Sequence, residues 1–180
     1  MAVLAVVFCA DTYTQEITGK RSEIQRLYPM KKRIGSICRR IVIQELFLFS
    51  LGAIGYGLFS IFQNPIVLNI GESNSGNGIS LFFTYLFAII ITNVFWGLLS
   101  NLFSCLARNM WVGIGACLIL WMVTNSSVGD KYLGARNLFS YTFRNVENSS
   151  DFSWIYGKVV CIGMAILVTV ILPEVIKKRG

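Results

Sequence analysis

Residues 79–103 read ISLFFTYLFAIIITNVFWGLLSNLF and contain neither an acid nor a base. A helix needs about 20 apolar residues to cross a bilayer, and a soluble core helix of this length normally shows a polar face. Three further apolar runs occupy residues 41–62, 110–128 and 155–172. We therefore expect an all-α, multi-pass membrane protein with four transmembrane helices.

The composition agrees with this class and narrows the chemistry. Apolar residues make up 54% of the 180 residues, and mean hydropathy is +0.62. Histidine is absent, which excludes imidazole bases, histidine-dependent triads and zinc sites built on histidine. The polar residues within the runs form no acid–base or metal cluster, so a membrane enzyme is the weakest hypothesis. We expect no catalytic residue, no metal and no enzyme activity.

The five cysteines are widely spaced, without a C-x-x-C pair or the pattern of a disulfide scaffold. We interpret them as small apolar residues of membrane helices. The alternative, a reactive or lipidated thiol, applies best to Cys38, which stands beside two arginines.

The net charge of +7 arises from 16 lysines and arginines against 9 acids. If the four runs are spans, twelve of these sixteen bases share one side: eight in residues 11–40, Arg108, and three at the C-terminus. By the positive-inside rule this side is the cytoplasm. The N-terminal loop and C-terminus are then cytoplasmic, and the loop 129–154 faces outward from the cell membrane. A nucleic-acid-binding module is excluded, since its bases would gather on one soluble face.

The apolar residues 1–10 are too short to cross a bilayer and lack the basic start of a signal peptide. They could be a re-entrant or interfacial piece, or the end of a transmembrane helix. Residues 11–40 combine apolar residues at helical spacing with many bases, which indicates a cytoplasmic amphipathic segment. Two capping-box patterns, beginning at Thr12 and Ser22, predict two short helices broken around Gly19, and Pro29 is expected to end the second.

A degenerate motif runs through this segment. The apolar residues 1–10 are followed by spaced acids, a glycine, a leucine, a proline and a base, in the order Glu16, Gly19, Glu23, Leu27, Pro29 and Arg33. Four apolar runs follow, with a long loop before the last. This layout resembles the membrane (permease) subunit of type-two ABC exporters.

The resemblance implies three units: residues 1–10 as the end of a transmembrane helix, 11–40 as a coupling segment, and 41–180 as a four-helix domain. It also implies that the coupling segment binds an ATP-binding cassette subunit, through Glu16, Ile17, Gly19, Glu23, Ile24, Leu27 and Pro29. ATP belongs to that partner, because this chain has no phosphate loop, and the chain itself is expected to hold no cofactor.

In that family a first helix and most of a second precede the coupling segment. We therefore expect a truncated or split permease, completed by a second permease chain or by another copy of this one within the lipid bilayer. The alternative function is a small four-helix assembly or regulatory subunit without transport activity. The alternative for the amphipathic segment is a helix that rests on anionic lipid without a protein partner.

Glu45 is the one acid inside an apolar run. It either belongs to a substrate or coupling path or forms an interfacial ion pair with Arg39, Arg40 or Arg108. Its position about one turn into the run favours the ion pair.

Three other polar residues also lie within the runs. Asn93 and Asn101 either hydrogen-bond across helices or face the bundle interior singly. Lys158 lies near the start of its run, so we expect its amine to extend to the membrane surface.

Overall fold

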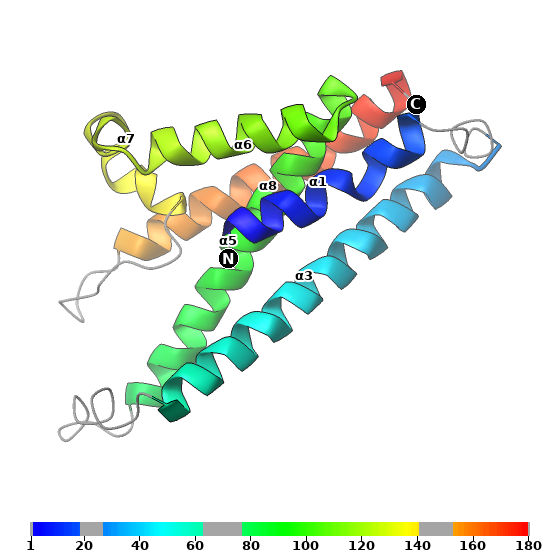
Figure 1. Ribbon diagram of the computed structural model, residues 1–180. Coiled ribbons are helices and arrows are strands. Elements are labelled where there is room, and N and C mark those ends of the chain that lie inside the picture. The colour runs from blue at the N-terminus through cyan, green and yellow to red at the C-terminus, as the bar shows by residue number, and fades with distance from the viewer. Residues whose placement is uncertain (1, 19–26, 63–76, 141–152, 180) are drawn as a thin grey trace.

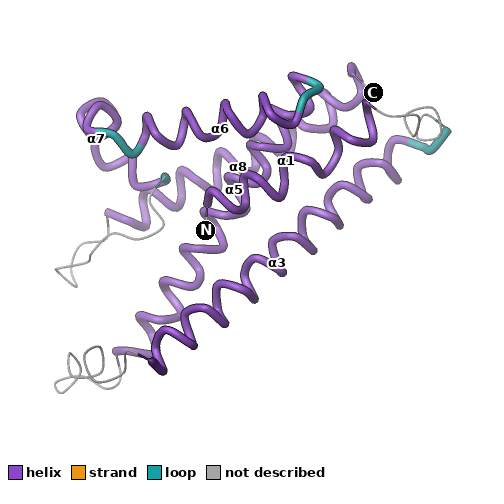
Figure 2. The backbone as a smooth tube through the Cα atoms, in the orientation of Figure 1, coloured by secondary structure: helices purple, strands orange, loops and turns teal. Residues whose placement is uncertain are grey.

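The computed structural model describes residues 2–18, 27–62, 77–140 and 153–179, and these ranges contain helices and turns but no strand (Figures 1 and 2). The elements are α1 (Ala2–Thr18), α3 (Met30–Phe62), α5 (Asn77–Ala107), α6 (Met110–Thr124), α7 (Ser127–Leu133), the 3₁₀ helix η2 (Gly134–Phe139) and α8 (Ser153–Arg179). The all-α prediction is confirmed over this part of the chain.

The central helix is α5, which contacts α1, α3, α6 and α8. In Figure 1, α1, α6 and α8 gather around its second half, while the end of α3 lies beside its start. Its buried side chains, among them Phe95, Trp96 and Leu99, join the hydrophobic core. A helix that is apolar on all sides is expected at the centre of such a bundle.

Two of the described helices are long and apolar enough to cross a membrane, over Leu86–Ala107 and Ile155–Lys178. A third crossing is formed if the bent pair α6 and α7 counts as one span. The runs 79–103 and 155–172 therefore lie in membrane-type helices, as predicted. The run 41–62 is helical within α3, but its side chains are described without a gap only as far as Gly55, so the fourth span stays a prediction.

The prediction of one helix over residues 110–128 is wrong. α6 ends at Thr124, α7 begins at Ser127, and the two axes differ by 72°. The side-chain amide of Asn125 donates to Trp121 O at 2.8 Å, and the Ser126 hydroxyl accepts from Gly129 N at 3.4 Å. These side chains satisfy backbone groups at a helix end and a helix start, which an apolar run of the same length could not do.

The helix α1 continues across the predicted unit boundary at residue 11, as far as Thr18. Thr12 therefore lies inside a helix and does not cap a new one. Ala5, Val6 and Cys9 of this helix are almost fully buried, and Ser100 Oγ donates to Val6 O at 2.7 Å. One face of residues 2–10 thus forms part of the bundle core.

Pro29 lies at the start of α3, and the short helix that it was predicted to end lies outside the described residues. The Pro29 carbonyl accepts from Lys32 N at 2.9 Å and Arg33 N at 3.3 Å, at the start of α3. Proline suits a helix start because its missing N–H would have no partner there. Residues 30–40, predicted to belong to a separate cytoplasmic segment, are therefore continuous with the run 41–62 in one helix of 33 residues, about 50 Å long.

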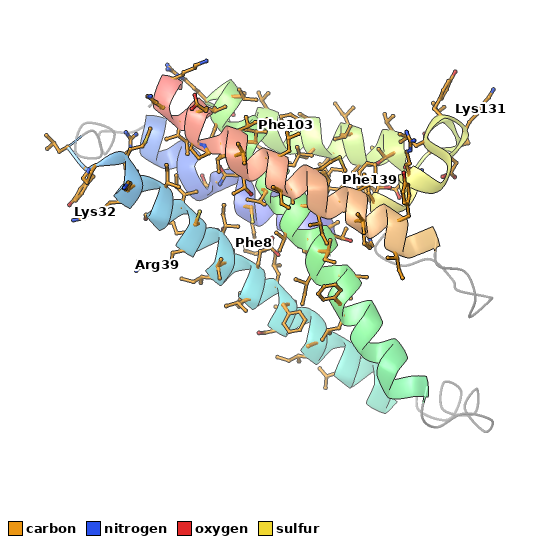
Figure 3. The ribbon with its side chains drawn as sticks, turned by 180° about the vertical axis from the view of Figure 1, so that it is seen from behind. Phe8, Lys32, Arg39, Phe103, Lys131 and Phe139 are labelled. Atoms are coloured by element: carbon orange, nitrogen blue, oxygen red, sulfur yellow. The ribbon has the colours of Figure 1, made fainter. Side chains whose placement is uncertain are left out.

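Most of the basic residues of the described helices lie at one end of the bundle. The end of α1, the start of α3, the junction of α5 with α6, and the end of α8 lie together in Figure 1. Lys31, Lys32 and Arg33 open α3, and Lys177 and Lys178 close α8. Lys131 lies at the opposite end from Lys32 in Figure 3. We call the end that contains Lys32 the basic end.

The helices α5 and α6 approach each other closely at Gly113. A Cβ added there would lie 2.7 Å from Ser104 N and 2.8 Å from Ser104 Cα, whereas a Cβ on Gly115 would meet nothing within 4 Å. Small residues at helix interfaces allow this approach in membrane proteins.

Gly113→Ala is expected to destabilise the protein by about 1–3 kcal/mol, since overpacking forces the helices apart. Gly115→Ala, in the same helix, is the matched control and is expected to be neutral or stabilising by up to about 1 kcal/mol, because alanine favours helix over glycine. Thermal unfolding in detergent, followed by circular dichroism, compares the two. Equal melting temperatures for both variants would contradict the close approach.

Candidate functional site

Glu45 lies where α1, α3 and α5 meet. It shares a face of α3 with the buried Ile41 and Leu48, which stand one turn before and after it. Its Oε1 accepts a hydrogen bond from Cys9 Sγ at 3.8 Å. A Cβ on Gly97 would lie 2.6 Å from that oxygen, so the absence of a side chain at Gly97 makes room for the carboxyl group.

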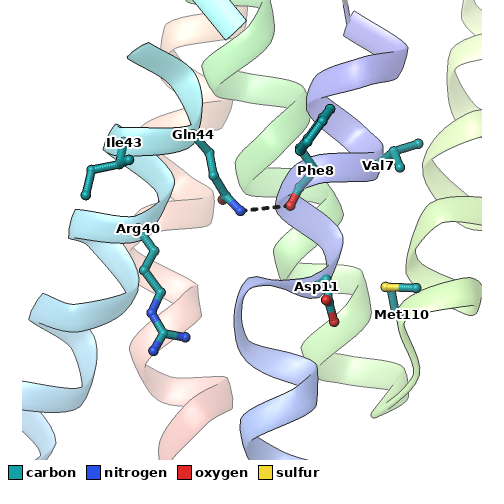
Figure 4. Close-up of a pocket in the computed structure, with 7 residues that line it drawn as sticks. All are labelled: Val7, Phe8, Asp11, Arg40, Ile43, Gln44 and Met110. Carbon is teal, nitrogen blue, oxygen red and sulfur yellow. Dashed lines mark hydrogen bonds between the residues drawn. The ribbon is translucent and has the colours of Figure 1, made fainter. Parts of the chain in front are cut away.

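The ion pair that we expected for Glu45 is not formed within the described part of the chain, where Cys9 is its hydrogen-bond partner. The helical turn explains this. Glu45 lies five positions after Arg40 in the sequence, which places their side chains about 140° apart around the helix axis. Arg40 faces a different pocket, toward α1 (Figure 4).

Glu45 and Asn93 line one cavity of about 430 Å³ between α3, α5 and α8. Asn93 is 2% exposed, and its amide oxygen has no hydrogen-bond partner among the described residues. The other lining residues are mostly apolar: Cys38, Ile41, Val42, Leu46, Phe49, Ile90, Val94, Leu98, Thr169 and Leu172. The structure therefore brings together two of the three predicted intramembrane polar residues.

Asn101 lies elsewhere in the bundle. It is buried two turns further along α5, and its Oδ1 accepts from Cys105 Sγ at 3.2 Å. Its amide nitrogen has no partner in the described part of the chain. No hydrogen bond from either asparagine to another helix is found there, so both follow the second alternative, in which they face the bundle interior singly.

The prediction that the Lys158 amine extends to the membrane surface is wrong. Lys158 is 5% exposed and does not extend to the surface, since its Nζ donates to Thr92 Oγ1 at 2.7 Å. The Thr92 hydroxyl in turn donates to Ala88 O at 2.8 Å. The sequence did contain a sign of this contact, because Thr92 and Asn93 form an adjacent polar pair within the longest uncharged run. A polar side chain at such a position needs a hydrogen-bond partner on a neighbouring helix.

A second pocket, of about 530 Å³, opens near the basic end between α1, α3 and α6 (Figure 4). Gln44 Nε2 donates to Phe8 O at 3.0 Å across it. The lining residues are Val7, Phe8, Asp11, Arg40, Ile43, Gln44 and Met110. An acid and a base thus face this pocket together, which gives it mixed charge and sets it apart from the cavity at Glu45.

The predicted partner-binding residues are distributed around the turn between α1 and α3. Glu16 and Ile17 lie in the last turns of α1, where the side chains are outside the described residues. Gly19, Glu23 and Ile24 also lie outside the described residues. Leu27 is 84% exposed, and Tyr28 and Pro29 are exposed beside it. We call residues 27–29 the exposed turn.

No protein-family model, curated protein or solved structure matches the chain. Among the described residues, no group of three or more cysteine, aspartate and glutamate side chains could hold a metal ion. The fold and the cavity together describe an α-helical protein with membrane-type helices and a carboxyl–amide pair inside an apolar cavity.

The contact between Lys158 and Thr92 can be tested with two matched threonine variants. Thr92→Val removes an acceptor from a buried amine and is expected to cost about 1–3 kcal/mol. Thr169→Val loses the same kind of hydrogen bond to the carbonyl four residues earlier, but its side chain is exposed, so it should change stability by less than about 0.5 kcal/mol. Thermal unfolding of the detergent-solubilised variants measures both changes in stability. Similar losses of stability in the two variants would refute the Lys158 contact.

Proposed function

We propose that the chain is the permease subunit of an ATP-driven ABC exporter. ATP is hydrolysed on a separate ATP-binding cassette subunit, and the chain itself carries no catalytic residue. The observation that carries this proposal is the exposed turn between α1 and α3. An almost fully exposed leucine beside a tyrosine and a proline, at the basic end, suits a docking element for a protein partner, because aromatic and large apolar side chains gain most from burial at an interface.

The helices that flank the exposed turn support a coupling role. α1 and α3 both contact α5, and they meet each other through the bond from Gln44 to the Phe8 carbonyl. A displacement of the turn by a partner would therefore pass along two packed helices to α5 and to the cavity beside Glu45. Close-packed helices shift as units and transmit such displacements.

The membrane orientation forms part of the same proposal. The basic end faces the cytoplasm by the positive-inside rule, which places the exposed turn and the C-terminus on the side where ATP is available. α7 and η2 then lie toward the outer side. A second permease chain or another copy of this one completes the transporter within the bilayer.

Affinity purification of the tagged chain from membranes of its native host tests the partner. We expect a co-purifying protein with an ATP-binding phosphate loop and measurable ATPase activity, and we expect both to be lost with Leu27→Glu. Tyr132→Glu is the control, because Tyr132 is similarly exposed, at 80%, but belongs to α7. The small assembly or regulatory subunit is favoured instead if no ATP-binding protein is recovered, or if Leu27→Glu retains it.

The orientation is tested by thiol labelling in oriented inner-membrane vesicles. In a Cys38→Ser background, Tyr28→Cys should react with a membrane-impermeant maleimide only from the cytoplasmic face. Tyr132→Cys should react only from the opposite face. Cys38 is removed because it is the exposed cysteine among the five, the other four being buried. Labelling of both positions from one face would refute the proposed orientation.

A further inference from the structure

The cavity between α3, α5 and α8 contains an acid with no basic partner from the described part of the chain. The Glu45 carboxyl accepts one hydrogen bond, from Cys9 Sγ at 3.8 Å, and a thiol is a weak donor. Glu45 is half-buried, and a carboxylate without a counterion is costly in an apolar environment. Its charge is therefore available to a ligand that carries a positive charge.

Asn93 adds a second, independent observation in the same cavity. This side chain is 2% exposed, and its amide oxygen has no hydrogen-bond partner among the described residues. Buried polar atoms are nearly always hydrogen-bonded in folded proteins, so each exception needs an explanation. Thr169, the hydroxyl-bearing residue of the lining, donates to Ala165 O at 2.8 Å and leaves this oxygen unsatisfied.

The residues that line the cavity indicate which class of cation it can bind. Ca²⁺ and Mg²⁺ take about six or more oxygen ligands, whereas Glu45, Asn93 and Thr169 are the lining residues with side-chain oxygens. The remaining walls are aliphatic apart from Cys38 and the ring of Phe49, and an aromatic face attracts cations. A volume of about 430 Å³ lies within the range of pockets that hold drug-sized molecules.

We propose that this cavity binds a lipophilic monovalent organic cation, whose charge lies at Glu45 and whose apolar body contacts the aliphatic walls. Val42 and Leu46 line the cavity and are also exposed on the outer face of α3, where such a molecule concentrates from the bilayer. That the cation is cargo rests on the proposed function. The binding itself does not, since every lining residue belongs to this chain.

Binding of radiolabelled tetraphenylphosphonium to the purified full chain in detergent tests the site by equilibrium dialysis. Saturable binding is expected for the wild type, with affinity at least about tenfold weaker in Glu45→Gln, the loss of one close charge pair being worth about 1.4 kcal/mol or more. Glu174→Gln is the matched control, because Glu174 is exposed on α8 and does not line the cavity. It should bind as the wild type does.

A second pair of variants tests the cavity without touching the acid. Val42→Trp places a large ring at the cavity wall and should weaken binding at least about fivefold. Val123→Trp makes the same change at a similarly exposed position of α6 and should not. The neutral probe triphenylphosphine oxide should show no difference between the wild type and Glu45→Gln.

The proposal is overturned if the wild type shows no saturable binding, or if neither Glu45→Gln nor Val42→Trp weakens it. It is also overturned if the neutral probe competes as well as the cation does. The assay contains no ATP-binding subunit, so a negative result here leaves the co-purification experiment standing. The converse also holds, since loss of the partner would not abolish cation binding.

Discussion

The packing of α5 against its neighbours is the constraint on which the other described features depend. α5 contacts α1, α3, α6 and α8, and it can approach α6 and α3 closely only because glycines stand at the contacts. Gly113 meets the backbone of Ser104, and Gly97 leaves room for the carboxyl group of Glu45. Between apolar helices in a bilayer, association depends on such van der Waals contact and on interhelical hydrogen bonds, because lipid removes the hydrophobic driving force.

The same packing determines how the polar residues of α5 are used. Ser100 reaches a carbonyl of α1, and Thr92 accepts the amine of Lys158 from α8, so these two groups connect helices. Asn93 makes no such contact within the described residues and lies with Glu45 at the apolar cavity. The contacts of each polar group of α5 thus follow from which neighbouring helix its face meets.

The two proposals concern two places along the same helix, α3. The exposed turn lies at the basic end, between α1 and α3, and the cavity lies where α3 passes α5 and α8. α3 is common to both. A partner that moved the turn would change the position of the α3 residues that line the cavity, and a cation held there would favour one position of α3 over another. Binding at either place would then affect the other to the same extent, as thermodynamic linkage requires.

The sequence by itself determined the class of protein, because long uncharged runs and a one-sided distribution of bases are properties of local composition. It also predicted that Glu45 and Asn93 are special, since a polar residue in an apolar run stands out without any structure. Only the tertiary structure decided their partners. Whether Glu45 meets an arginine or a cavity depends on the rotation of α3 against α5, and whether Lys158 turns outward depends on Thr92 lying opposite it. The break after Thr124 follows from local hydrogen bonds of Asn125 and Ser126, whereas the burial of α1 depends on contacts with a segment far away in the chain, such as the bond from Ser100 to the Val6 carbonyl, which local patterns do not encode.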